Sequence, residues 1–420
     1  MDWFIAGIQL YLLFLFLYTA VIGFLGLRPV KQQPQAKPKH RFAVLVAAHN
    51  EEQVIGGIVK NLREQSYPAQ LYDVYVICDN CSDRTAAVVR ENGGIAMERF
   101  NQTLRGKGHA LEWMFERLWD LEAQGTHYDA VVVFDADNLV SRNFLSVMNT
   151  KISEGHEVIQ GYLDTKNPHD TWITKASAYA YWTTNRVYQL SRDQLGLSAQ
   201  LGGTGLVVST QVLKQIGWRT TSLTEDLEFT QRYILETGRR VAWAHEAKIY
   251  DEKPLGLRAS MKQRVRWMAG HTDCALRYAV PLFRKAISGS IISFDSLVYL
   301  LSPSRNILYL LYLLIIGASL ADRYLFNMPL IHSPNEVLLL HPAVHVLVFS
   351  LNVILSFTGL MLEQRGRKWF WFFYVILFGL SWVPVTIQGI LSRRQRNWSH
   401  TQHTRNVSLE DIEAVAGKTA

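Results

Sequence analysis

The sequence contains few cysteines and few charged residues, and both shortages exclude classes of protein. Only three cysteines, Cys78, Cys81 and Cys274, occur among 420 residues. That number excludes a disulfide framework and a zinc site built from cysteine alone. We interpret the Cys-x-x-Cys spacing of Cys78 and Cys81 as a strand end and a turn rather than as a redox pair. No Gly-x-x-x-x-Gly-Lys phosphate loop is present either.

Charged residues make up 19% of the chain and hydrophobic residues 49%, with a net charge of +7. The apolar excess is uneven, since it lies at the N-terminus and in the last third. The basic residues crowd beside these apolar runs. This distribution favours contact with an anionic lipid bilayer over binding of nucleic acid.

The first apolar run, residues 3–27, carries no charge. About 20 residues cross a bilayer, so the run is long enough. It begins after Asp2 and lacks the cleavage site of a signal peptide, which predicts a retained transmembrane helix over 1–28. Arg28 and Lys31 begin a basic flank, and the positive-inside rule then places the N-terminus outside and the following insert in the cytosol.

Three later apolar runs, 296–320, 337–362 and 369–391, predict a C-terminal transmembrane region over 291–392. Buried core helices are the alternative interpretation. Three crossings would leave the polar tail, 393–420, outside, whereas its arginines indicate the cytosol. Either residues 286–303 add a short or re-entrant segment, or one run does not fully cross, so the number of crossings stays open. Pro303 predicts a kink in the first of these runs.

Between the apolar regions, residues 40–255 alternate between strand and helix patterns. Strands are predicted at 42–48, 72–78 and 130–134, and helices at 51–65 and 83–92. This alternation predicts an α/β domain with a mainly parallel sheet covered on both faces. Asn50-Glu51, Asp79 and Asp135 each follow a strand. Because ligands bind at the carboxyl ends of such strands, these residues predict a site.

Asp135 and Asp137 are two apart on an extended chain, so they point the same way and suit one divalent cation. Mg²⁺ prefers a few carboxylates together with substrate phosphates. A solvated turn is the alternative. Asp79 suits a hydrogen bond to a base or ribose, with turn formation an equal contender. Lys107, in a glycine-containing loop, suits a phosphate, and a solvated lysine is as good an interpretation.

Asp226 follows Thr224, which we expect to cap a helix from about 225 to 235, and the helix dipole there favours an ionised carboxylate. Such a carboxylate can deprotonate a hydroxyl within hydrogen-bond reach, or it can merely cap the helix. Gln263 and Trp267 share one face of an amphipathic stretch. Arg266 beside them suits a diphosphate. The alternative is an interfacial helix over 256–290 whose tryptophan anchors in headgroups and whose other basic residues, Arg264 among them, face lipid.

These segments together resemble the membrane-integrated family 2 glycosyltransferases. That group includes cellulose, chitin, hyaluronan and poly-N-acetylglucosamine synthases and ceramide glucosyltransferase. The resemblance covers about 41–270 and is carried by Ala47–Glu51, Asp79, Asp135-Ala136-Asp137, Thr224-Glu225-Asp226 and Gln263-Arg264-Val265-Arg266-Trp267. It implies a GT-A fold, a UDP-sugar donor, Mg²⁺ or Mn²⁺ and inversion at the anomeric carbon.

The resemblance also implies residue roles. Asp226 would be the base and Asp137 the metal ligand. The donor would be held by Ala48, Asn50, Glu51, Asp79, Lys107, Asp135, Gln263 and Arg266. The acceptor would meet Gly203, Thr204, Gly205, Glu225 and Trp267. The sequence departs from the pattern at Ala47-Ala48, where many members have a proline, and in having one N-terminal span where several synthases have two.

The sequence therefore predicts a plasma-membrane enzyme with a cytosolic catalytic domain. It would transfer GlcNAc or glucose from a UDP-sugar to a growing extracellular polysaccharide. The chain is shorter than cellulose synthases, so an accessory membrane subunit is expected, or the product is short. The first alternative is single addition of a sugar to a membrane lipid. The second, a non-catalytic export subunit, would lack a carboxylate at Asp137 or Asp226, and both are present.

Overall fold

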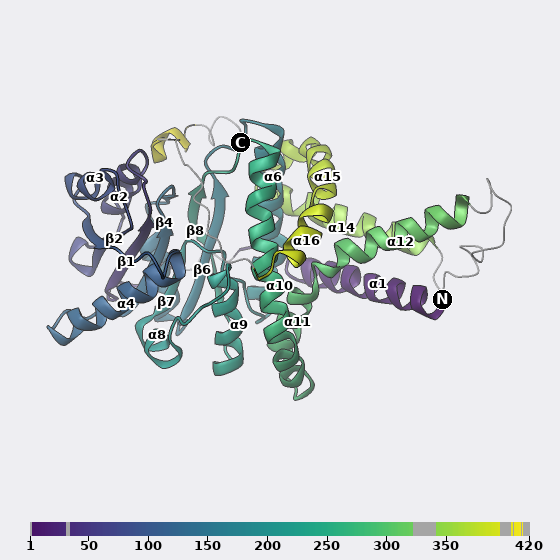
Figure 1. The fold of residues 1–420 in the computed structure, drawn as a ribbon, viewed down its shortest axis with the longest axis horizontal. Coiled ribbons are helices and arrows are strands. Elements are labelled where there is room, and N and C mark those ends of the chain that lie inside the picture. Colours follow the sequence, from purple (N-terminus) through teal and green to yellow (C-terminus); the bar gives the residue numbers. More distant parts are fainter. Residues whose placement is uncertain are drawn as a thin grey trace.

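A computed structural model describes residues 2–30, 34–321, 342–394, 405, 407–412 and 414 of the chain. Figure 1 shows a β-sheet domain on one side and a group of long helices on the other. The helical group combines the N-terminal helix with helices from the last third of the chain. Segments at the two ends of the sequence thus lie together beside the sheet domain.

The sheet contains eight strands in the order β3-β2-β1-β4-β7-β6-β8-β5. Their bounds are β1 (Phe42–Ala48), β2 (Tyr72–Asp79), β3 (Ile95–Arg99), β4 (Ala130–Asp135), β5 (Leu139–Val140), β6 (Val158–Thr165), β7 (Leu206–Ser209) and β8 (Ala242–Asp251). Strands β3, β2, β1 and β4 are parallel, whereas β7 is antiparallel to both β4 and β6. The α/β class is confirmed, but the sheet is mixed rather than mainly parallel. Strand β7 is apolar and buried like its parallel neighbours, so its composition did not reveal its direction.

Alternate residues of the central strands enter two different cores. Leu45 and Val133 belong to one core with Leu111 of α4 (Lys107–Ala123), and Val44 to the other with Ile55 of α2 (Ile55–Arg63). This period of two buries both faces of the sheet. The remaining short helices of the domain are η1 (Ala69–Leu71), α3 (Thr85–Glu91), α5 (Phe144–Ser153), α8 (Thr210–Ile216) and α9 (Glu225–Thr237).

Two long helical segments connect the sheet domain with the apolar helices. The first runs through α6 (Trp172–Thr184), a π-helical turn η2 (Asn185–Leu190) and α7 (Ser191–Gln194). The second is α10 (Leu257–Ile287), which packs against α9, α11 (Ile291–Leu301) and α16 (Trp382–Leu391). Both segments therefore contact the sheet domain and the apolar helices.

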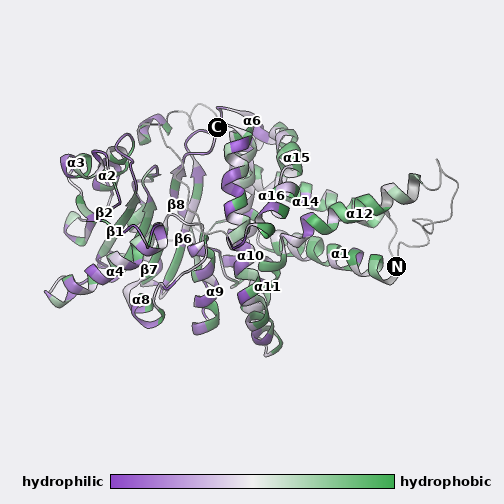
Figure 2. Ribbon diagram, viewed as in Figure 1, coloured by the Kyte–Doolittle hydropathy of each residue, from purple (hydrophilic) through white to green (hydrophobic). Residues whose placement is uncertain are grey.

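The apolar helices are α1 (Asp2–Leu25), α11, α12 (Ser304–Ala321), α14 (Pro342–Leu362), α15 (Phe372–Leu380) and α16, with the turn η4 (Gly366–Trp371) before α15. Figure 2 colours most of these helices as hydrophobic, whereas the helices of the sheet domain carry both hydrophobic and hydrophilic colours. Among the described residues, Phe4–Leu25 and Gly366–Leu391 are long and apolar enough to cross a membrane. Helices α11 and α12 make a third candidate if they count as one span.

Helices α11 and α12 meet at an angle of 51°, and Pro303 lies in the break between them. The predicted kink is thus confirmed. The predicted run 337–362 begins outside the described residues, and its described part is α14. Most of the predicted tail, 393–420, also lies outside the described residues. The described residues of the tail contact the sheet domain, where the Arg142 guanidinium pairs with the Glu410 carboxylate.

Candidate active site

A cavity of about 990 Å³ opens beyond the carboxyl ends of β1, β2 and β4. It gathers residues that lie far apart in the sequence, from Leu15 to Trp382. Of the predicted site residues, it is lined by Ala48, Glu51, Asp79, Lys107, Asp135, Asp137, Gly203, Thr204, Glu225, Asp226, Gln263, Arg266 and Trp267. The carboxyl groups of Asp137 and Asp226 thus share one cavity although 88 residues separate them in sequence. Asn50 and Gly205 do not line the cavity.

Lys107 is the first residue of α4, and its ammonium group holds two loops together. The Nζ atom lies 2.5 Å from Oδ1 of Asp135 and donates a hydrogen bond of 2.5 Å to the carbonyl oxygen of Gly203. Burial alone would lower the pKa of Lys107, but the carboxylates of Asp135 and Glu225 raise it, so the ammonium stays charged. A fixed positive charge therefore lies beside the Asp-x-Asp pair.

The Gly202–Gly205 loop is fixed to the sheet by backbone contacts. The amide of Gly205 donates to the carbonyl of Val133 (2.8 Å), and the buried amide side chain of Gln160 bonds Gly202 N and Thr204 O at 2.9 Å each. Gly203 and Gly205 have φ values of +81° and +63°, in the region that favours glycine. A β-carbon on Gly203 would lie 3.5 Å from Asp226 Oδ2, so the loop borders the predicted base.

Asp137 is buried, at 4% exposure. Its carboxylate accepts hydrogen bonds from the Glu252 amide (3.1 Å) and from Asn138 Nδ2 (3.2 Å). The nearby Asp251 pairs with Lys253 at 2.7 Å, yet its Oδ1 is buried without a hydrogen-bond partner among the described residues. Burial, followed by the negative charges of Asp137 and Asp135, raises the pKa of Asp251.

These carboxylates fit a divalent cation, because a cation would relieve their mutual repulsion and satisfy the orphaned oxygen of Asp251. Within the described part of the chain, no three His, Cys, Asp or Glu side chains form a complete metal cage. Such a site suits Mg²⁺ or Mn²⁺ with the remaining ligands from phosphate and water.

Glu225 and Asp226 begin α9 and face the cavity. Burial, together with the adjacent charge of Glu225, raises the pKa of Asp226 to about 7. Burial also raises the pKa of Glu225. The backbone amides at the helix start favour the ionised form of Asp226, as expected, but loss of solvent and the charge of Glu225 outweigh them. The predicted capping by the Thr224 side chain is wrong, since its hydroxyl contacts Ser222 instead. A base with this pKa is poised for proton transfer near neutral pH.

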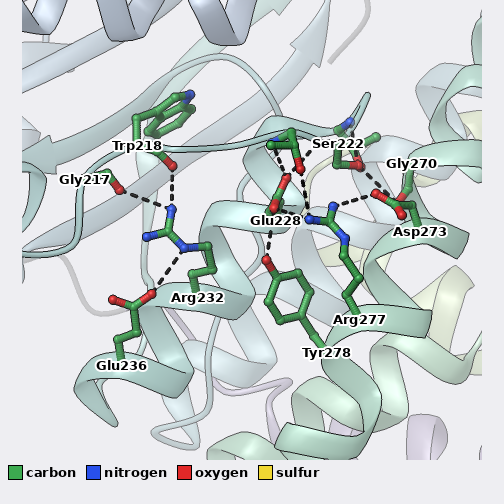
Figure 3. Close-up of polar contacts among 12 residues, drawn as sticks. Gly217, Trp218, Ser222, Glu228, Arg232, Glu236, Gly270, Asp273, Arg277 and Tyr278 are labelled. Atoms are coloured by element: carbon green, nitrogen blue, oxygen red, sulfur yellow. Dashed lines mark hydrogen bonds and ion pairs between the residues drawn. The ribbon is translucent and has the colours of Figure 1, made fainter. Parts of the chain in front are cut away.

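A buried carboxylate fixes the start of α9 against α10 (Figure 3). Glu228 Oε2 accepts hydrogen bonds of 2.7 Å from the amides of Thr221 and Ser222, and Oε1 accepts from Arg277 (2.6 Å) and Tyr278 (3.0 Å) on α10. Burial would raise the pKa of Glu228, but the Arg277 bond and the two amides outweigh it and lower the pKa. This Glu228 cluster sets the position of Asp226 relative to the residues on α10.

Close backbone packing reinforces this arrangement. Ser222 Oγ donates to the carbonyl of Gly270 on α10 at 3.3 Å. A β-carbon on Gly270 would lie 2.4 Å from Thr224 Oγ1, closer than atoms can pack. Glycine is therefore the residue that lets α10 approach the loop before α9.

Asp79 and Asn50 have structural partners at the ends of β2 and β1. Asp79 Oδ1 pairs with Arg99 at 2.5 Å, and Arg99 Nη2 also donates to Leu104 O at 2.7 Å. Asn50 has a φ of +55°, and its Oδ1 accepts a hydrogen bond of 2.8 Å from the Ser82 amide. Asn50 thus joins two loops instead of facing the cavity. Cys81 approaches Asn50 through its sulfur, in agreement with the predicted turn position.

The position of the Arg264 side chain contradicts the interpretation that this residue faces lipid headgroups. Its side chain is buried, at 1% exposure, with its guanidinium carbon 4.0 Å from the Phe378 ring centroid and 4.9 Å from that of Trp382. Trp267 faces the cavity. The helix α10 therefore presents these residues to α15, α16 and the cavity rather than to a membrane surface.

Sequence reasoning missed several lining residues. Asp251 lines the cavity at the end of a strand that carries no recognised motif. Tyr188 lies on the π-helical turn, lines the cavity and has a buried hydroxyl without a partner in the described part of the chain. The position of Asp251 at the end of a strand was a sequence signal that could have predicted its place in the site. No comparable signal was available for Tyr188.

Comparison with known proteins identifies relatives of this chain. A family model described as "Glycosyltransferase like family 2" matches residues 38–270. The chain is 29% identical over 301 residues to a beta-monoglucosyldiacylglycerol synthase of Trichormus variabilis, with 68% of this chain and 61% of that protein covered. It is 25% identical to the probable glycosyltransferase YdaM of Bacillus subtilis, with 60% of each covered. The match thus spans about three fifths of these relatives.

A solved structure shares the fold over most of the chain. The mannosyltransferase PcManGT of Pyrobaculum calidifontis, in complex with GDP-Man and Mn²⁺, has a TM-score of 0.59 at 16% identity. The alignment covers 94% of this chain and 99% of that one. This similarity confirms the predicted GT-A architecture. Because the family model covers more than half of the sequence, the chain belongs to the family 2 glycosyltransferases.

Proposed function

We propose that this protein transfers a single sugar from a nucleotide diphosphate sugar to a hydroxyl group of a membrane lipid. One observation carries the proposal. The cavity that contains Asp137 and Asp226 continues among the apolar helices, where Leu15, Val298 and Leu355 line it. A polar donor and an acceptor that resides in the bilayer can therefore meet in one space.

The donor half of the cavity suits a UDP-sugar. Asp79 at the end of β2 accepts hydrogen bonds from the nucleoside, and Lys107, Gln263 and Arg266 hold the diphosphate. Asp137, with Asp251 beside it, holds Mg²⁺ or Mn²⁺. When bound, the cation neutralises charge on the departing diphosphate.

Asp226 acts as the general base. Its carboxylate takes the proton of the acceptor hydroxyl as that oxygen forms a bond to the anomeric carbon. The bond from the anomeric carbon to the diphosphate oxygen breaks at the same time, and UDP leaves with the electron pair. This single displacement inverts the anomeric configuration. Gly203 and Trp267 border the acceptor beside the base.

A lipid acceptor is supported better than the polymer product that the sequence first indicated. The relatives from Trichormus variabilis and a Nostoc species are named beta-monoglucosyldiacylglycerol synthases, and this name denotes a glycolipid. The apolar lining of the cavity also suits acyl chains. We propose a membrane enzyme whose sheet domain lies in the cytosol, as the basic residues after α1 favour.

The test uses purified full-length protein in lipid nanodiscs with a panel of UDP-sugars, Mg²⁺ or Mn²⁺, and diacylglycerol as acceptor. Mass spectrometry of the lipid product should show one added sugar. Asp226→Asn should lose transfer by about 10²–10⁴-fold while it retains UDP binding. Asp120→Asn, which removes an exposed carboxylate far from the motifs, is the matched control. A ladder of polymer products would instead support polysaccharide synthesis.

The role of the metal has its own test. Asp137→Asn should raise the Mn²⁺ concentration that gives half-maximal transfer, and a chelator should abolish transfer by the native protein. Full activity after metal removal would contradict the assignment of Asp137.

A further inference from the structure

The carboxylates that line the cavity lie at one end of it, together with the basic side chains of Arg105, Lys107 and Lys253. All eight carboxylates of the lining belong to the sheet domain and α9: Glu51, Asp79, Asp135, Asp137, Glu225, Asp226, Asp251 and Glu252. From residue 257 onward, the charged residues of the lining are Arg264, Arg266 and Arg305. Arg266 faces the donor half, where its charge acts on Glu225. Arg264 and Arg305 remain at the end of the cavity that lies among the apolar helices.

Neither of these two arginines has an acidic partner in the part of the chain that the structure describes. Arg264 donates from Nη2 to Ser381 Oγ (2.9 Å) and from Nε to Ser260 O (3.3 Å), and its Nη1 is buried without a partner. Burial lowers the pKa of Arg264 to about 10, with no carboxylate to oppose the effect. Arg305 likewise forms no ion pair with any described residue.

A third arginine that lines the cavity, Arg192, is also buried but has an acidic partner within the protein. Arg192 Nε pairs with Asp295 Oδ2 at 2.9 Å, and Tyr18 donates to the other oxygen at 2.9 Å. Both charged side chains are almost fully buried, at 3% and 0% exposure. The charge of Arg192 is therefore neutralised within the protein, whereas those of Arg264 and Arg305 are not.

Helix α16 brings the two unpaired arginines to one neighbourhood. Arg264 packs on Trp382 in the first turn of α16. Asn306, the residue after Arg305, donates to Thr386 one turn further along the same helix at 3.3 Å. Ser302, Ser356 and Asn352 also line the cavity and supply further polar groups, while Leu355 and Phe378 supply apolar surface.

Guanidinium groups removed from water without a counter-ion are costly, and a phosphate is the anion that their planar donor arrangement fits best. We propose that Arg264 and Arg305 form a binding site for the phosphate of an anionic membrane lipid at the membrane end of the catalytic cavity. This inference rests on the proposed function, and it names the chemistry of the lipid that enters the site. The phosphate belongs either to the acceptor itself or to an anionic lipid bound beside a neutral acceptor.

The experiment uses full-length protein in phosphatidylcholine nanodiscs with a UDP-sugar donor. Three compositions are compared: diacylglycerol alone, diacylglycerol with phosphatidylglycerol, and phosphatidylglycerol alone, whose headgroup carries both a phosphate and free hydroxyl groups. A glycosylated phosphatidylglycerol would identify the acceptor as the source of the phosphate. Glycosylation of diacylglycerol that rises at least tenfold with phosphatidylglycerol would identify an accompanying lipid. Equal glycosylation of diacylglycerol with and without phosphatidylglycerol, and none of phosphatidylglycerol itself, would overturn the inference and leave the proposed function intact.

Variants connect the lipid effect to the two arginines. Arg305→Gln should reduce the anionic-lipid effect at least tenfold while UDP binding stays unchanged. Arg264→Gln should do the same, and Arg264→Lys, which keeps the charge, should recover part of the loss if the first variant folds poorly. Arg284→Gln is the matched control, since it removes an exposed charge of α10 outside the cavity. An unchanged lipid effect in Arg305→Gln would overturn the assignment. Absence of transfer to every lipid would instead contradict the proposed function.

Discussion

The ammonium nitrogen of Lys107 lies 2.5 Å from Oδ1 of Asp135 and equally close to the carbonyl oxygen of Gly203. This contact joins the start of α4, the end of β4 and the loop before β7. It places a positive charge at the position where a sugar diphosphate would meet the Asp-x-Asp pair.

Loss of the Lys107 charge should weaken donor binding. We expect Lys107→Gln to raise the dissociation constant for UDP by roughly 10–100-fold, since a hydrogen bond to a charged group contributes about 1.5–3 kcal/mol. Isothermal titration calorimetry measures the change. Lys214→Gln, which removes an exposed lysine paired with Glu122, should bind UDP like the native protein. Equal affinity in both variants would mean that Lys107 serves only the fold.

The raised pKa of Asp226 predicts the pH dependence of transfer. The base must be ionised, so kcat/KM should rise as the pH passes through about 7 and then level off. Glu225→Gln removes the neighbouring charge, one of the two causes that raise the pKa of Asp226. Its pH profile should therefore shift to lower pH. A profile that is flat between pH 5 and 8 in both proteins would exclude Asp226 as the base.

The same pKa shift predicts a pH-dependent stability. Between the unfolded pKa of about 3.9 and the folded value near 7, the folded protein binds more protons than the unfolded chain. This group therefore destabilises the fold progressively as the pH rises through that window. Asp226→Asn, which removes the titration, should gain melting temperature relative to the native protein at pH 8 and lose that advantage at pH 4. A constant difference across this range would contradict the shift.

The Glu228 cluster predicts coupling between stability and catalysis. Glu228→Ala leaves the amides of Thr221 and Ser222 unsatisfied and leaves Arg277 with Asp273 as its remaining carboxylate partner, so we expect a loss of about 2 kcal/mol in the free energy of unfolding. Transfer should also fall, because this loop leads into the start of α9, where Asp226 lies. Glu236→Gln on the same helix removes an exposed i,i+4 partner of Arg232 and should cost less than about 0.5 kcal/mol. Chemical denaturation of both variants makes the comparison.

The close approach of α10 to the loop before α9 predicts that Gly270 does not tolerate substitution by a larger residue. Gly270→Ala places a β-carbon 2.4 Å from Thr224 Oγ1 and should destabilise the protein by about 1–3 kcal/mol. Gly379→Ala is a matched helical control, since nothing lies within 4 Å of its β-carbon. Thermal unfolding and UDP release report on stability and activity. If the two variants behave alike, the close packing at Gly270 has no energetic consequence.

The sequence pattern predicted the positions of several strands of the sheet domain correctly. Strands 42–48, 72–78 and 130–134 lie within one residue of their observed bounds, because runs of buried β-branched residues are unmistakable. Helix 51–65 was predicted too long, since residues 51–54 form the turn that carries Glu51 into the cavity and α2 begins at Ile55. The direction of β7 was not predictable, because a strand buried on both faces shows the same composition in either orientation.

The amino-acid sequence by itself determined the reaction class, the apolar spans and the residue types of the site. These depend on chemistry and periodicity that are local to each motif. Only the tertiary structure decided which groups meet. In the structure, Asn50 lies outside the cavity and Asp251 lines it. Arg264 is buried, and burial raises the pKa of Asp226. These features depend on contacts between segments far apart in the chain, so no local pattern predicts them. The end of the cavity that lies among the apolar helices is the clearest case, since residues from α10, α12, α14 and α16 line it and no motif in the sequence connects them.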